Sequence, residues 1–330
     1  MNKKKIAFGV SAFALAATVA GAGLAAADPS GAPTYRQLSG VGSDTTQDVM
    51  NGMAAAISVG GQKVIGSYDS TGSANITTKD PANGNCTMAR PNGSGAGRSA
   101  LLTSLQAGNG CLDFARSSSL NLAAAAPGLT YVPFAVDGVT YAITPGSAIP
   151  RKLSLTDLKA IYHCDPNYVG SGPNYAMTVY LPQAGSGTRS FWESQMGITD
   201  ADVVAGVYPC IKDKKGTTPV QEHDGRLLDD KSIVPFSIAQ YQSQSSQTIA
   251  DLRGRAILGT VDGTAPTVLN SGFGVKRDVY NVIPTSKVGT APWSTVFVGA
   301  NSEICKQTSV INTYGFATSP NCGDITKQTP

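Results

Sequence analysis

Apolar residues along the chain follow two patterns, and together they predict an α/β fold. Short apolar runs typical of strands occur at 38–43, 63–68, 112–115, 131–143, 179–181, 232–239 and 278–283. The stretches 45–57, 98–107, 155–162, 188–196 and 302–314 are typical of helices, several with apolar residues spaced by three or four. The run at 131–143 is read either as a strand pair or as one long strand that crosses between two lobes. Because strands alternate with helices, we expect a mixed, mainly parallel sheet.

Small hydroxyl-rich turns follow several of the predicted strands. They are Gly42–Thr46, Ser70–Ser73, Arg116–Ser119 and Gly185–Arg189. In an open α/β sheet, ligands bind beyond the carboxyl ends of the strands, so these turns are expected to converge on one cleft. A cluster of hydroxyl and backbone N–H donors predicts a site for a small oxyanion. The alternative is a chance coincidence, since serine and glycine are abundant in this chain.

The most specific of these turns is Gly185-Ser186-Gly187-Thr188-Arg189, which opens a predicted helix. Its glycines let the backbone N–H groups point at one centre, and the positive end of the helix lies behind them. Ser186 and Thr188 add hydroxyl donors, and Arg189 adds a positive charge. The turn therefore favours an oxyanion pocket, and its alternative reading is a loop that only caps the helix.

The first residues indicate export from the cell. Three lysines at 3–5 precede an apolar stretch at 6–24 and an Ala-Ala-Ala sequence at 25–27. This order is typical of a signal peptide, and we expect cleavage after Ala27. No cysteine lies near the cleavage site, so we expect no lipidation and no membrane anchor. The mature protein is predicted to be secreted, either to the periplasm or outside the cell.

Charge and cysteine content narrow the function further. The chain has 25 basic and 22 acidic residues, and the leader carries three lysines and no acid, so the mature chain is neutral. A neutral chain argues against nucleic-acid binding, which needs a basic surface. With six cysteines and two histidines but no Cys-x-x-Cys pair, three disulfides are expected and a metal site is not. Pairing of nearest neighbours closes the shortest loops and gives Cys86–Cys111, Cys164–Cys210 and Cys305–Cys322.

The order of several motifs resembles that of the phosphate-binding subunits of Pst-type ABC importers. The motifs are Val132–Val139, Leu153–Tyr162, Ala184–Arg189, Val261–Thr267, Arg277–Tyr280 and Tyr314–Phe316. The resemblance implies a two-lobed periplasmic-binding-protein fold of the second topological type. It also implies a monomer that binds phosphate or a similar oxyanion, uses no cofactor, serves an ABC importer permease and is not an enzyme. The expected division is a signal peptide over 1–27, a first lobe over 28–134, a second lobe over 135–236 and a return to the first lobe over 237–330.

The resemblance also implies a set of ligand-binding residues. They are Ser43, Asp44, Thr45, Thr46, Ser73, Arg116, Ser117, Ser118, Gly185, Ser186, Gly187, Thr188 and Arg189. The chain departs from the family at two places. Ser118 stands where many members have an aspartate, and Pro182 and Gln183 stand where many have an arginine. Asp44 is the candidate replacement for the aspartate, and Arg116 or Arg189 for the arginine.

Each of these replacements has a structural alternative. Asp44, or Ser43 beside it, is equally well placed to cap the helix that follows. Arg189 can pair with Glu193 four residues along the same helix, and Arg116 can belong to a buried ion pair.

Two other functions are compatible with the residues. A secreted esterase or phosphatase would use Ser186 as its nucleophile and His223 as its base, but Ala184 takes the first glycine's place in a G-x-S-x-G elbow. The run Glu222–Arg226 is the one segment in which a histidine lies beside two carboxylates, as in some catalytic sites. Its polar, glycine-containing sequence is more typical of a solvated turn. The third possibility is a surface or interaction protein that keeps the fold without the ligand.

Overall fold

A computed structural model describes residue 28 and residues 35–171, 176–266 and 272–330 of the chain. The expected signal peptide over 1–27 lies outside the described residues. Within the described ranges, no helix combines the length and the apolar character needed to cross a membrane.

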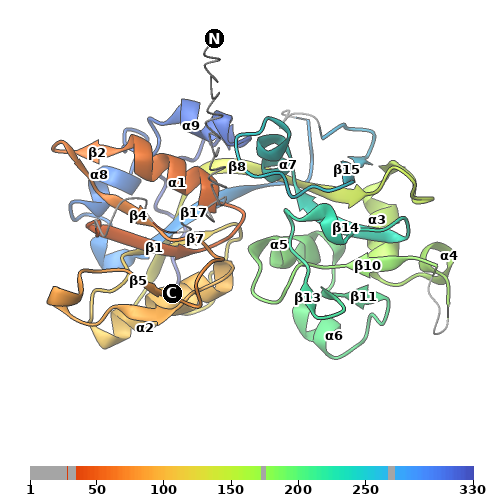
Figure 1. Cartoon of the computed structure of the whole chain (residues 1–330), viewed down its shortest axis with the longest axis horizontal. Helices are drawn as coiled ribbons and strands as arrows, with labels where there is room; N and C mark the ends of the chain where they lie inside the picture. The colour runs from red at the N-terminus through yellow and green to blue at the C-terminus, as the bar shows by residue number, and fades with distance from the viewer. Residues whose placement is uncertain (1–27, 29–34, 172–175, 267–271) are drawn as a thin grey trace, which may run out of the picture.

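A ten-stranded mixed sheet runs through both halves of the molecule in the order β11-β10-β14-β8-β17-β7-β1-β4, with β15 and β18 also paired to β8 (Figure 1). Its strands are β1 (Leu38–Gly42), β4 (Ile65–Ser67), β7 (Phe114–Ser117), β8 (Leu129–Ile143), β10 (Thr178–Tyr180), β11 (Ile211–Lys212), β14 (Ser232–Ser237), β15 (Ile257–Leu258), β17 (Lys276–Pro284) and β18 (Ala317–Thr318).

Two long strands join the two lobes. In Figure 1, β1, β4 and β7 lie in one lobe, β10, β11 and β14 lie in the other, and β8 and β17 extend between them. The outer strands pair in parallel within each lobe, whereas β8 and β17 are antiparallel to each other and to the strands beside them. Of the two readings of 131–143, the structure has the single long strand. The boundary expected between 134 and 135 falls inside this strand.

The helices cover both faces of the sheet. They are α1 (Gln47–Ala56), α2 (Ser94–Ala107), α3 (Leu155–Tyr162), α4 (Pro166–Val169), α5 (Gly187–Met196), α6 (Asp200–Val204), α7 (Ile238–Ser245), α8 (Trp293–Phe297) and α9 (Thr308–Thr313). Short pairs of strands lie outside the main sheet: β2 (Ser58–Val59) with β3 (Gln62–Lys63), β5 (Asn75–Thr77) with β6 (Thr87–Ala89), β9 (Lys152–Leu153) with β16 (Thr260–Val261), and β12 (Lys214–Lys215) with β13 (Thr218–Pro219). The single-turn 3-10 helices are η1 (Pro81–Asn83), η2 (Gly225–Leu227) and η3 (Thr285–Lys287).

Alternation along the strands places a hydrophobic layer on each face of the sheet. In the first lobe, Phe114 packs in a core with α1, α8 and α9, whereas the next residue, Ala115, packs on the opposite face with α2. In the second lobe, Val179 faces a core with α3 and α5, and Tyr180 faces a smaller cluster on the other side. Each lobe therefore has its own core, as expected for a two-lobed fold.

The local signals predicted some helix ends and not others. The helix α3 begins after Ser154 as expected, because Ser154 and Asp157 form a reciprocal capping box, and it ends at Tyr162, also as expected. The expectation that Ser43 or Asp44 caps α1 is wrong, since the N-cap is Thr46 and the helix begins at Gln47.

Two elements near the C-terminal end of the fold are shorter than the sequence predicts. The strand β14 ends at Ser237, because the Ser237 hydroxyl accepts a hydrogen bond from the Gln240 N–H (3.2 Å) and caps α7. Of the helix expected over 302–314, only α9 forms. Residues 301–306 form turns instead, and Cys305 within them is bonded to Cys322.

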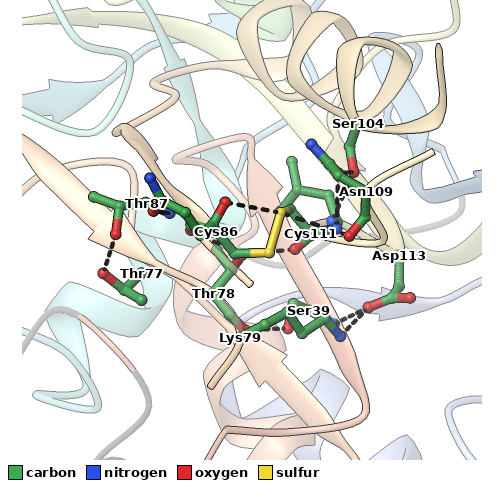
Figure 2. The surroundings of a disulfide bond; sticks show 12 residues. Ser39, Thr77, Thr78, Lys79, Cys86, Thr87, Ser104, Asn109, Cys111 and Asp113 are labelled. Atoms are coloured by element: carbon green, nitrogen blue, oxygen red, sulfur yellow. Dashed lines mark hydrogen bonds and ion pairs between the residues drawn. A yellow bond between two sulfur atoms is a disulfide. The ribbon is translucent and has the colours of Figure 1, made fainter. Parts of the chain in front are cut away.

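The structure contains the three expected disulfides: Cys86–Cys111, Cys164–Cys210 and Cys305–Cys322. Figure 2 shows how the first of them is supported by hydrogen bonds. The Thr78 hydroxyl donates to the carbonyl of Cys111 (2.7 Å), and the Thr78 N–H donates to the carbonyl of Cys86 (3.1 Å). Lys79 pairs with Asp113 at 2.5 Å just before β7. The bridge thus ties the β5–β6 hairpin to the segment that leads into β7.

Close packing of α2 against β1 depends on Gly97. A Cβ atom at position 97 would lie 2.4 Å from the Cα of Gly42 and 3.0 Å from the carbonyl oxygen of Val41, both backbone atoms. A Cβ at Gly95, in the same helix, would meet its nearest atom at an ordinary 3.5 Å.

We expect Gly97→Ala to lower the free energy of unfolding by about 1–3 kcal/mol through overpacking. Gly95→Ala is the matched control, and it is expected to be neutral or to stabilise the helix by up to about 1 kcal/mol. Urea denaturation of both variants checks the difference, and equal effects would contradict the packing described for α2.

Candidate functional site

Three of the four polar turns meet between the lobes. The Thr45 hydroxyl, which follows β1, lies 3.4 Å from the Ser118 hydroxyl, which follows β7. Across the lobes, Thr45 Oγ1 lies 3.3 Å from Thr188 Oγ1 at the start of α5. Together with Ser186, these residues are called the hydroxyl cage below, and all four are completely or almost completely buried. The carboxyl ends of strands from both lobes therefore face one point, and of the four turns predicted to converge, Ser70–Ser73 does not share these hydrogen bonds.

Glycine at position 187 allows the lobes to touch. A Cβ atom there would lie 2.3 Å from Ser94 Oγ and 2.5 Å from Ser118 Oγ, both in the first lobe. Beside this contact, the N–H of Gly95 donates to the carbonyl of Gly185 across the lobes (3.1 Å). Ser94 was not predicted at the site, although its hydroxyl accepts from the N–H of Ser118 (3.0 Å). The structure therefore has the lobes closed over the hydroxyl cage.

A carboxylate of the protein itself lies inside the cage. Glu222 is 0% exposed, and its Oε1 accepts hydrogen bonds from Thr45 (2.5 Å) and Thr188 (2.8 Å). Its Oε2 accepts a hydrogen bond from Ser186 (3.1 Å). The prediction of a solvated turn is therefore wrong for Glu222, because donors from both lobes enclose its side chain.

The backbone of Glu222 belongs to the second lobe. Its carbonyl accepts a hydrogen bond from the N–H of Ser237 (3.1 Å) at the end of β14. Val220, two residues earlier, packs in the small second-lobe cluster with Tyr180. Only the side chain of Glu222 therefore reaches across to the first lobe.

A buried ion pair flanks the cage. Asp137 on β8 and Arg277 on β17 are register partners, and Arg277 Nη2 donates to Asp137 Oδ2 (3.0 Å). The same Nη2 donates to Thr188 Oγ1 (2.6 Å). The other guanidinium nitrogens, Nε and Nη1, are buried and have no hydrogen-bond partner among the described residues. Sequence reasoning noted Arg277 only within a motif and did not place it at the site.

Asp44 and His223 form the polar border of the cage. Asp44 Oδ1 accepts the N–H of Thr45 (2.9 Å), and Asp44 Oδ2 lies 3.6 Å from His223 Nδ1 without a hydrogen bond. With Glu222 they are a group whose potential metal-ligand atoms lie within 4.8 Å of one another. Both carboxylate oxygens of Glu222 already accept hydroxyl hydrogen bonds.

The two neighbouring carboxyls titrate in opposite directions. Burial, and secondly the charge of Glu222, raise the pKa of Asp44 to about 7. Burial also disfavours the charged form of Glu222, but His223, the Thr45 hydroxyl and a backbone hydrogen bond outweigh it and lower the pKa of Glu222 below its usual value. Glu222 is therefore the ionised member of the pair at neutral pH.

The two arginines expected at the ligand make contacts within their own lobes, although Nη2 of Arg116 is buried without a hydrogen-bond partner among the described residues. Arg116 is buried, and its Nε donates to the carbonyl of Ser43 (3.1 Å) while its Nη1 donates to the hydroxyl of Ser67 (3.0 Å). Arg189 pairs with three carboxylates, those of Glu193 (3.0 Å), Asp200 (2.6 Å) and Asp213 (3.3 Å). Of the two readings of Arg189, the structure has the pair with Glu193.

Four further predicted residues lie outside the hydrogen bonds of the cage. Ser73 is exposed, and its hydroxyl accepts from Arg90 Nη2 (2.7 Å). The Ser117 hydroxyl donates to the carbonyl of Ser119 (2.7 Å). The buried hydroxyls of Ser43 and Thr46 have no hydrogen-bond partner among the described residues.

A cavity of about 350 Å³ borders the cage at the junction of the lobes. It is lined by Ser94 and Ser117 from the first lobe and by Gly185 and Ser190 from the second. The cavity lies where the two lobes meet beside α5, and it is lined by neighbours of the cage residues rather than by the cage residues themselves.

Comparisons with known proteins agree with this architecture at the level of fold. No family model and no curated protein matches the sequence. The structure is similar to a putative phosphate ABC transporter substrate-binding protein from Clostridium perfringens with bound phosphate, with a TM-score of 0.52 and 17% identity over 86% of this chain and 99% of that one. It is also similar to an ABC-type phosphate transport receptor from Vibrio cholerae, with a TM-score of 0.50 and 16% identity over 86% of this chain and 100% of that one. The chain therefore has the two-lobed fold of type 2 periplasmic binding proteins.

The raised pKa of Asp44 predicts how stability depends on pH. The folded protein keeps the Asp44 proton up to about pH 7, whereas an unfolded aspartate loses it near pH 3.9. The folded state binds more protons between these values, so this contribution is fully present below about pH 4 and is lost as pH rises toward 7. Urea denaturation across this range should show the loss in the wild type and a smaller one in Asp44→Asn. Equal pH profiles of the wild type and Asp44→Asn would contradict the raised pKa of Asp44.

The contacts of Arg189 predict a role in stability. Removing one partner of a buried ion pair leaves an uncompensated charge, so Arg189→Ala should lower the free energy of unfolding by about 3 kcal/mol. Arg226, which pairs with Asp224 on the surface and is 58% exposed in its side chain, is the matched control. Arg226→Ala should cost less than about 1 kcal/mol. Similar losses in the two variants, measured by urea denaturation, would rule out this role.

Proposed function

We propose that the protein is a secreted solute-binding protein that closes its two lobes around a small oxyanion, with phosphate as the first candidate. The observation that carries the proposal is the set of hydroxyls from both lobes that surrounds a completely buried carboxylate. Carboxylate and phosphate oxygens accept the same hydrogen bonds, so a cage that holds one is chemically suited to the other. The similar proteins of the same fold include one with bound phosphate.

Unused donors beside the cage support an anionic solute. Two guanidinium nitrogens of Arg277 and the hydroxyls of Ser43 and Thr46 are buried and unpartnered. A buried donor without a partner loses about 1–3 kcal/mol relative to one that is hydrogen-bonded. An oxyanion that accepts from these groups would recover that free energy. The N-terminal end of α5, capped by Ser186, adds a positive partial charge on the second-lobe side.

Binding would be coupled to closure because the donors are divided between the lobes. Thr45 and Ser118 come from the first lobe, and Ser186 and Thr188 come from the second. A solute that contacts both sets stabilises the closed form over the open one, with β8 and β17 as the connections that bend. The division of the chain into lobes at 28–134, 135–236 and 237–330 is part of this proposal, as are a monomeric state and delivery to an ABC importer permease.

The geometry favours binding over hydrolysis. The hydrolase considered from the sequence would have the Ser186 hydroxyl hydrogen-bonded to the imidazole of His223 as its base. The Ser186 hydroxyl instead donates to Glu222 and accepts from the N–H groups of Thr188 and Arg189 as the cap of α5. His223 faces Asp44.

Phosphate, sulfate and arsenate should each be titrated over the millimolar range while the melting temperature is followed. We expect saturable stabilisation of the wild type by at least one of these anions. Arg277→Lys keeps a charge for Asp137 but removes the unpartnered donors, so it should weaken binding by about tenfold or more, since a hydrogen bond to a charged group contributes about 1.5–3 kcal/mol. Arg226→Lys, an exposed arginine away from the cage, is the control.

The proposal fails if none of the three anions stabilises the protein at any concentration. A surface or interaction protein on the same fold would then be the better reading.

A further inference from the structure

We propose that the side chain of Glu222 is an internal ligand, which occupies the oxyanion position of the closed protein and competes with the solute. The inference rests on the proposed function, because it concerns the same cage. It goes further in naming a regulatory element within the chain. Glu222 would act both as a competitor for the cage and as a latch between the lobes.

The contacts of Glu222 are those expected of a bound anion. The carboxylate is completely buried, and it accepts hydrogen bonds from Thr45 of the first lobe and from Ser186 and Thr188 of the second. A buried carboxylate is unfavourable unless its charge is compensated by such donors. Although burial opposes ionisation, the charge of His223 and the hydrogen bond from the Thr45 hydroxyl lower the pKa of Glu222 and favour its ionised form.

The solute and the carboxylate cannot use the cage together. Each hydroxyl has one hydrogen, and those of Thr45, Ser186 and Thr188 already point to Glu222. An anion placed beside an ionised carboxylate in a buried site is also repelled by it. Solute binding therefore requires the Glu222 side chain to leave the cage.

The surrounding structure allows the side chain to leave while the backbone stays in place. The carbonyl of Glu222 is held by Ser237 (3.1 Å), and the carbonyl of His223 accepts from Gln244 Nε2 (2.8 Å) on α7. Opening of the lobes breaks the contact with Thr45 and leaves only second-lobe donors around the carboxylate. Rotation of the side chain in the open form would then clear the cage.

This arrangement predicts two consequences for Glu222→Gln. Phosphate should bind more tightly by about tenfold, the value expected if the carboxylate fills the cage in roughly nine molecules of ten. Without phosphate, the variant should populate the open form more, because its neutral amide holds the lobes together less well than a carboxylate. Calorimetric titration measures the first effect, and small-angle scattering of the phosphate-free protein measures the second.

Two further variants of the full-length protein complete the experiment. Glu222→Asp keeps the charge but shortens the side chain, so it should also tighten phosphate binding. Asp224→Asn removes the carboxylate that pairs with Arg226 in the same segment, and it should leave binding and lobe opening unchanged. Melting curves of all variants confirm that they fold.

The possible outcomes are distinct. Tighter binding in both Glu222 variants supports the internal ligand. Unchanged binding in Glu222→Gln overturns it, and weaker binding overturns it too, because Glu222 would then contact the solute. If phosphate, sulfate and arsenate fail to bind the wild type and every variant, the proposed function fails. In that case small-angle scattering of the phosphate-free protein alone tests the latch: a more open Glu222→Gln variant supports it, and an unchanged one overturns it.

Discussion

The arrangement of the site depends on the buried ion pair between Asp137 and Arg277. Taking two charges out of water is unfavourable unless each is paired and its remaining hydrogen-bonding groups are satisfied. Burial raises the pKa of Asp137, and the charge of Arg277 and hydrogen bonds from Ser237 and Ala239 oppose this shift. Arg277 in turn reaches Thr188 at the start of α5. One ion pair therefore fixes two long strands and the first turns of two helices around a common point.

The site contains acidic side chains as well as hydrogen-bond donors for an anion. Asp137 pairs with Arg277, and the buried carboxyls of Asp44 and Glu222 lie close to each other and to His223. Asp44 responds by holding its proton up to about pH 7, and Glu222 by collecting hydroxyl donors. In this structure the cage therefore already holds an anion, the carboxylate of Glu222, which accepts the hydroxyl hydrogen bonds. If the proposed function holds, an incoming oxyanion exchanges with the side chain of Glu222, which already occupies the cage.

Features determined by neighbours in sequence could be predicted, and features determined by distant neighbours could not. The capping box of Ser154 and Asp157 fixes the start of α3 locally. The turns after β1, β7 and β10 converge because the strands of the two lobes run toward each other from opposite sides of the crossover strands. Arg189 is different, since two of its carboxylate partners lie 11 and 24 residues away. From the sequence, only the glycine-rich turn before Arg189 and Glu193 after it were visible, and the turn favoured an oxyanion pocket over an ion pair.

Glu222 could not be recognised from its own segment. Polar residues and a glycine follow it, and such a sequence is normally solvated. Its burial is produced by Thr45, which is 177 residues away in the other lobe. The one available signal was negative: Ser118 stands where many members of the resembling family have an aspartate.

The three disulfides all lie within single lobes. Cys86–Cys111 and Cys305–Cys322 connect parts of the first lobe, and Cys164–Cys210 connects α3 to the strand at the edge of the second. No disulfide therefore restrains rotation of one lobe about the other, and the hinge strands β8 and β17 carry no cross-link. The cross-links therefore stabilise each lobe by itself and leave the lobes free to open and close.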